Sequence, residues 1–168
     1  DIFFRNDGDG QNVVWLLQDG QKVSGGQVGS SNSSASYLAT SLGKTLPIQI
    51  LNQGEFSSMQ TRLNIVASNA TELNQIYQYL NTEAPEVGFN NNIAIGVFRG
   101  RRDTGGYSIT IGQVVEHSGS VDVAVELHEA GPGCNVTSAL TYPYQIISIP
   151  KTGNKPINFI EKTVIDQC

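Results

Sequence analysis

Charged residues are scarce in this chain. Only 15% of its 168 residues are charged, and 10 basic against 15 acidic side chains give a formal net charge of −5. Proteins that bind nucleic acid need a dense cationic face to meet the phosphates. The tight basic cluster of the chain is limited to Arg99, Arg101 and Arg102. The composition therefore argues against nucleic acid as a partner.

Long apolar runs are missing as well, and cysteines are few. No run approaches the roughly 18 residues of a membrane-spanning helix, so no membrane span is expected. The two cysteines, Cys134 and Cys168, are too far apart for a CxxC redox or zinc motif. A disulfide between them is favoured and would indicate an extracellular, periplasmic or cell-surface location. Two free thiols in a cytosolic protein are the alternative.

What the chain does have is a succession of short segments with strand character. They are rich in Val, Ile, Tyr and Phe and are separated by Gly, Pro, Asn or Asp turns. In residues 121–127, apolar side chains alternate with Asp122, Ala124 and Glu126, which predicts one buried face and one wet face. The expected strands of this second half are 93–98, 107–111, 121–127, 144–149 and 157–165.

One helix is predicted among these strands. Asn69 stands three residues before Glu72, as in a capping box, and an apolar stripe at helical spacing follows from Leu73 to Leu80. The predicted fold is therefore mainly β, or β-rich α+β. We expect antiparallel sheets that form a twisted sandwich or a partial barrel, with the helix of residues 69–81 packed on one face.

Residues 1–46 are expected to form an appendage to a main domain at 47–168. Two apolar runs flank an Asn-Asp-Gly-Asp-Gly turn at 6–10, which predicts a β-hairpin, and a Gly/Ser-rich linker follows from 25 to 36. Residues 1–40 are similar to part of an FG-GAP or VCBS-type propeller repeat. One such piece cannot bury its own core, so domain exchange through 1–46 is conceivable, and the oligomeric state stays open.

A longer resemblance covers residues 47–165. The string Arg-Gly-Arg-Arg-Asp-Thr-Gly-Gly-Tyr begins at residue 99, and strand 121–127, a Gly-Pro-Gly turn and a strand ending in Pro150-Lys151 follow it. This order resembles the C-terminal domain of protease-complex subunits of the PrcB type. The resemblance implies an extracytoplasmic, non-enzymatic module that associates with, stabilises or inhibits a secreted protease. The alternative is a surface adhesion or carbohydrate-binding β module.

Two loops are candidates for contact with such a partner. The first combines arginines, which bind carboxylates through bidentate forks, with a Gly-Gly turn. The second holds an aromatic pair stiffened by proline, a good interface anchor. The alternatives are a structural hairpin turn and an edge strand whose tyrosines cover the core. If both loops lie at one end of the sheet, the interface is favoured. The candidate residues are Arg99, Arg101, Arg102, Asp103, Thr104, Gly105, Gly106, Tyr107, Tyr142, Pro143 and Tyr144.

Catalysis, metals and cofactors are not expected. Asp7-x-Asp9-Gly10 has too few ligands for a calcium loop and is better explained as a turn. The two histidines, His117 and His128, are isolated and lack a zincin pattern. The acidic residues Glu116, Asp122, Glu126 and Glu129 are read as an exposed acidic face rather than as paired carboxylates of a hydrolase.

Overall fold

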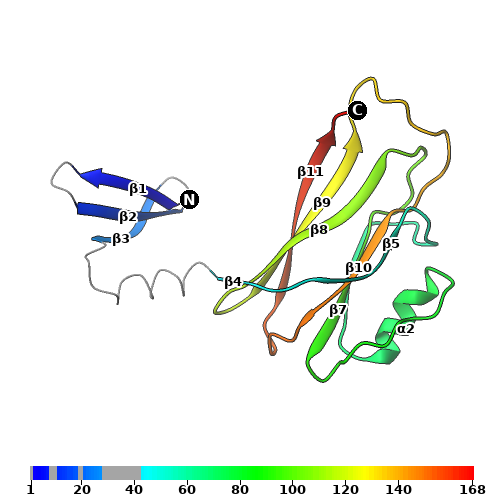
Figure 1. Ribbon diagram of the computed structural model, residues 1–168, viewed down its shortest axis with the longest axis horizontal. Coiled ribbons are helices and arrows are strands. Elements are labelled where there is room, and N and C mark those ends of the chain that lie inside the picture. The colour runs from blue at the N-terminus through cyan, green and yellow to red at the C-terminus, as the bar shows by residue number, and fades with distance from the viewer. Residues whose placement is uncertain (1, 8–10, 19–20, 28–42) are drawn as a thin grey trace. The chain divides into compact units, whose positions relative to one another are not determined.

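The computed structural model describes residues 43–168 in full, and the backbone alone for 2–7, 11–18 and 21–27 (Figure 1). The chain divides into two compact units, Asp1–Gly43 and Lys44–Cys168. Residues 8–10 of the turn proposed at 6–10, and the Gly/Ser tract from residue 28 onward, lie outside the described residues. No helix among the described residues is long and apolar enough to cross a membrane.

The first unit contains a three-stranded antiparallel sheet. Its strands are β1 (Ile2–Asp7), β2 (Gln11–Gln18) and β3 (Gln21–Gln27), in the order β1-β2-β3. The expected hairpin is thus extended by a third strand. Gly25 and Gly26, which the sequence placed in a linker, pair with Trp15 and Val14. Backbone pairing with a neighbouring strand here overrides the low strand propensity of glycine.

The second unit is a sandwich of two four-stranded sheets with one helix, as the sequence predicts (Figure 1). We call the first sheet the helix-side sheet; its order is β5 (Gln49–Gly54), β10 (Tyr144–Pro150), β7 (Asn92–Phe98) and β6 (Leu63–Ala67). We call the second the outer sheet; its order is β11 (Ile157–Asp166), β9 (Val121–Ala130), β8 (Tyr107–Glu116) and β4 (Lys44–Thr45).

Side-chain alternation along the central strands builds two cores. Ile93, Ile95 and Val97 of β7 face the outer sheet, where they meet Val121, Val123 and Val125 of β9 in one buried cluster. The intervening residues of β7 point the other way, toward the helix, and Phe98 packs there with Leu73 and Ile76. The central strands of this sheet, β7 and β10, are therefore buried on both faces, which explains their nearly continuous apolar sequences.

The helix is shorter than expected. Helix α2 spans Ala70–Gln78. Its N-cap is Asn69, whose side chain accepts a hydrogen bond from the Glu72 backbone N–H at 2.9 Å. Beyond Gln78 the backbone tightens: the N–H groups of Leu80 and Asn81 bond to carbonyls three residues earlier, and Asn81 takes a φ of 51°. The apolar stripe therefore continues past the point where the helix ends.

One pairing differs from the antiparallel pattern. β11 runs parallel to β9 over ten residues, from Ile157 opposite Val121 to Asp166 opposite Ala130 (Figure 1). Alternation within a strand cannot distinguish the two directions, because both give a two-residue period. A disulfide joins Cys134 to Cys168, in agreement with the sequence expectation, and their Cα atoms are 5.6 Å apart.

Candidate partner-binding site

The two candidate loops meet in the structure. The backbone N–H of Arg102 donates to Thr141 O at 2.8 Å, and the N–H of Thr141 donates back to Arg102 O at 2.9 Å. The Thr141 hydroxyl also donates to Thr104 O at 3.0 Å. These bonds hold the segment after β7 against the segment before β10, about 40 residues apart in sequence.

A third segment, which the sequence did not single out, completes this end. The N–H of Tyr142 donates to Glu55 O at 2.7 Å, and the Ser57 hydroxyl donates to Tyr142 O at 3.0 Å. The N–H of Arg101 donates to Gln60 O at 3.0 Å. We call the surface formed by residues 55–60, 99–107 and 136–143 the three-loop end. Backbone hydrogen bonds connect all three segments.

Several large apolar side chains are exposed on the three-loop end. Phe56 is 68% exposed and Leu140 is 45% exposed, and Val136 is also exposed. Asp103 and Arg101, in the 99–107 segment of the same end, are exposed and form an ion pair at 3.1 Å. Apolar side chains next to a charged rim are the usual composition of a surface that binds another protein.

Arg99, in contrast, is part of the interior and is only 2% exposed. Its guanidinium donates to Ser108 O at 2.8 Å and His128 O at 2.7 Å, and it forms an ion pair with Glu129. Burial, followed by the neighbouring positive charge of Arg102, lowers the pKa of Arg99. The buried cation thus ties the end of β7 to the outer sheet, and it is not available to a partner.

The other candidates divide between surface and interior. Arg102 and Tyr107 are half-buried, and both Arg99 and Arg102 lie over the Tyr107 ring, at 5.1 and 5.5 Å from its centroid. Gly105 is buried against Thr137. Gly106 is exposed and has a φ of 78°, so the Gly-Gly turn needs its glycine for backbone reasons.

Of the three candidate residues in the aromatic loop, Tyr142 is partly exposed, whereas Pro143 and Tyr144 are buried. The Tyr144 ring stacks on Phe98 with centroids 6.0 Å apart, and its hydroxyl donates to Asn52 Oδ1 at 3.1 Å. Burial raises the pKa of Tyr144. Tyr144 therefore covers the core, as the alternative interpretation of this loop expects. Tyr142 remains accessible to a partner.

The acidic residues and histidines lie on the outer sheet. His128 Nδ1 is 3.0 Å from Asp166 Oδ1, while its Nε2 is 3.3 Å from Thr110 Oγ1 and 3.6 Å from Glu126 Oε2. His128 therefore connects three strands, β8, β9 and β11. His117 contacts Asp122 at 3.2 Å near the β8–β9 turn. Within the described chain, no group of three or more His, Cys, Asp or Glu side chains could hold a metal ion.

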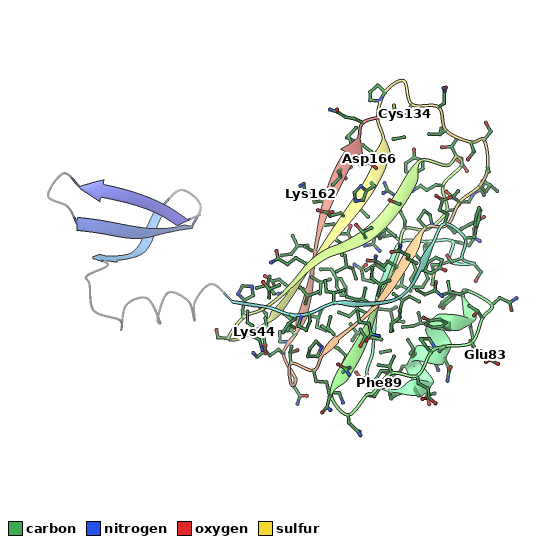
Figure 2. All side chains as sticks on the ribbon, in the orientation of Figure 1. Lys44, Glu83, Phe89, Cys134, Lys162 and Asp166 are labelled. Carbon is green, nitrogen blue, oxygen red and sulfur yellow. A yellow bond between two sulfur atoms is a disulfide. The ribbon has the colours of Figure 1, made fainter. Side chains whose placement is uncertain are left out.

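A hollow of about 500 Å³ lies elsewhere in the second unit. It is bounded by the helix residues Ala70, Leu73 and Asn74 and by the chain from Ala84 to Phe89, near the labelled Phe89 in Figure 2. None of its lining residues belongs to the three-loop end. It therefore contributes nothing to the candidate site.

The fold and the site define a β-sandwich module with one covering helix and a surface built from loops at one end. Within it, residues 93–150 match the model of the family described as PrcB C-terminal. The match runs from β7 through β10 and includes both candidate loops. It confirms the resemblance for this part of the chain, while the resemblance of residues 1–40 to a propeller repeat stays a prediction. No curated protein matches the chain, and no solved structure matches it either.

Sequence reasoning missed Phe56 and the segment around it. A single aromatic residue between Glu55 and Ser57 has no periodicity that would mark it as important. The available signal was a phenylalanine in a polar, turn-rich stretch. Only the hydrogen bonds of its neighbours Glu55 and Ser57 to Tyr142 show that this segment belongs to the site.

Proposed function

We propose that this chain is a protein-binding module that associates with an extracytoplasmic protease through the three-loop end, and that it acts by binding rather than by catalysis. The family match supports the protease as partner, since it suggests a subunit of a protease complex. The disulfide is compatible with an extracellular or periplasmic location. Stabilisation and inhibition of the protease are both consistent with such binding.

One observation carries this proposal: three segments far apart in sequence converge at one end of the sandwich and carry the exposed side chains of Phe56 and Leu140. The backbone under these side chains is fixed by hydrogen bonds to Glu55, Gln60 and Thr141. A rigid support lowers the entropy that ordering a loop would cost on binding. Aromatic side chains on rigid supports are common energetic centres of protein interfaces.

The proposed surface differs from the sequence prediction in its composition. Arg99 and Tyr144 hold the fold, so the contacts are assigned to Phe56, Tyr142 and Leu140, with Arg101 and Asp103 at the rim. The rim charges are expected to influence the association rate more than the affinity, because exposed ion pairs contribute about 0–1 kcal/mol.

The test is affinity capture from the secreted proteins of the source cells, with the captured proteins identified by mass spectrometry. We expect a peptidase to be recovered by the unaltered chain and lost with Phe56→Ser. Ile160→Ser is the matched control, because Ile160 is 54% exposed but lies on β11, outside the three-loop end. Retention on glycans without any peptidase, or equal recovery by Phe56→Ser and the unaltered chain, would overturn the proposal.

A further inference from the structure

Strand β5 is an edge of the helix-side sheet. Among the described residues, β5 pairs with β10 alone, so no described strand pairs with its opposite side. An edge strand offers a row of backbone N–H and C=O groups that can bind another extended chain. Proteins commonly block such edges with charged side chains, proline, very short strands or covering contacts.

The other three edges of the sandwich are blocked in these ways. β4 is only two residues long. β11 carries Glu161, Lys162 and Asp166 along its length. Glu161 also accepts hydrogen bonds from Arg62 at 2.6 Å and Asn64 at 3.3 Å, so it ties the β6 edge to the β11 edge across one side of the sandwich.

Among residues 43–168, no strand covers the outer side of β5, and its ladder with β10 contains one bulge, opposite Ile146 and Ile147. The sequence of β5, Gln-Ile-Leu-Asn-Gln-Gly, contains no charge and no proline over six residues. Ile50 is 55% exposed, and Gln49 and Gln53 are exposed as well. The strand ends at Gly54, directly before the segment that carries Phe56, so the open edge continues into the three-loop end.

We propose that β5 binds an extended segment of the partner protein by strand addition, as a fifth strand of the helix-side sheet. This proposal rests on the proposed function, because it specifies how the same partner is held. Backbone hydrogen bonds would supply most of the recognition, and an uncharged, partly apolar segment fits beside Ile50.

A second copy of this chain is the less suitable occupant. A six-residue strand is roughly 20 Å long and about 5 Å wide, so one edge pairing covers on the order of 100 Å². A stable dimer needs about 800 Å² on each partner. An extended segment of a protein that also contacts the three-loop end covers more surface than the edge alone, because β5 leads directly into residues 55–60.

A random dodecapeptide library displayed on phage tests this edge without knowledge of the partner. Peptides are selected on the full chain and then measured on Ile50→Lys, which places a charge on the edge. Ile160→Lys is the matched control, since the two isoleucines are 55% and 54% exposed. We expect selected peptides to lose at least tenfold in affinity on Ile50→Lys and to keep their affinity on Ile160→Lys.

Hydrogen exchange on the unaltered protein gives a second readout that does not depend on how the variants fold. A bound peptide is expected to slow exchange at amides of β5 while leaving those of β11 unchanged. The inference is overturned if no peptide is enriched, if peptides bind Ile50→Lys normally, or if β5 is already protected throughout in the free chain.

The two proposals fail in different ways. Recovery of a peptidase that Phe56→Ser abolishes, together with unaltered peptide binding by Ile50→Lys, would leave the proposed function intact and reject strand addition. Peptides that depend on Ile50, without any recovered peptidase, would support an extended ligand at β5 and reject the protease as the partner.

Discussion

The side-chain carbonyl oxygen of Gln145 lies 2.6 Å from the backbone nitrogen of Ile111, and this buried hydrogen bond joins the two sheets. The register of β8 against β9 shifts just beyond it, between Ile111 and Gln113, so β8 carries a bulge there. β4 pairs only with the far end of β8, at Val115 and Glu116. Gln145 therefore accepts a hydrogen bond from the Ile111 N–H, which β4 does not reach.

Replacing Gln145 with leucine is expected to destabilise the fold by about 1–3 kcal/mol, since the Ile111 N–H would be left buried without a partner. Urea unfolding measures this directly. Gln53→Ala is the control. It removes the 2.9 Å bond from Gln145 Nε2 to Gln53 Oε1, but Gln53 is exposed, so a loss below about 1 kcal/mol is expected. Equal losses in both variants would contradict the bridging role.

The buried arginine offers a second comparison. Arg99→Leu removes the donor from two backbone carbonyls, Ser108 O and His128 O, and should cost about 2–3 kcal/mol in the free energy of unfolding. Arg101→Leu changes an exposed side chain and should cost less than about 0.5 kcal/mol. Thermal unfolding of both variants is the measurement. A normal stability of Arg99→Leu would show that the interior tolerates the loss of the cation.

Gly106 is expected to resist substitution for reasons of backbone and space. With a φ of 78°, an added Cβ would lie 2.5 Å from Val136 Cγ1 and 2.8 Å from Ala130 Cβ. Gly106→Ala should therefore cost about 1–3 kcal/mol. Gly119→Ala, where an added Cβ meets nothing within 4 Å, should be nearly neutral in calorimetry. Because Gly106 variants are expected to disturb the fold, Phe56 is the better probe of partner binding.

A pH dependence is expected from Glu116. The hydrogen bond from Lys155 Nζ, at 2.8 Å, lowers the pKa of Glu116 below its ordinary value of 4.5. A carboxyl with a depressed folded-state pKa contributes stability above its unfolded pKa, and that contribution is lost as pH falls through the folded pKa. Stability measured from pH 6 to pH 3 should fall less steeply in Glu116→Gln than in the unaltered chain. An NMR titration of the Glu116 carboxyl that gives an ordinary pKa would contradict this prediction.

The local sequence pattern predicts much of the fold. Val121, Val123 and Val125 are completely buried, as their alternation predicts, and Asn69 caps the helix as its spacing to Glu72 indicates. The parallel direction of β11 was not predictable in this way. It depends on which strand lies beside β9 after the chain crosses between sheets, and that neighbour is set by tertiary packing.

The site was only partly predictable for a related reason. The sequence marks Arg99 and Arg101 as members of one basic cluster, yet one is buried and the other is exposed. Their separation follows from the ladder: the N–H of Arg99 still donates to Pro143 O, whereas the N–H of Arg101 has left the sheet and donates to Gln60 O. A composition-based interpretation cannot show where a strand stops and its loop begins.

The disulfide has a mechanical consequence. Cys134 follows β9 and Cys168 follows β11, so the bond lies where the two parallel strands end, near the labelled Asp166 (Figure 2). Tension that enters the chain at Cys168 passes through the sulfur atoms to Cys134, so the intervening polypeptide carries no load. Strands β10 and β11, and the Tyr142 loop between the cysteines, would keep their shape while the module is pulled.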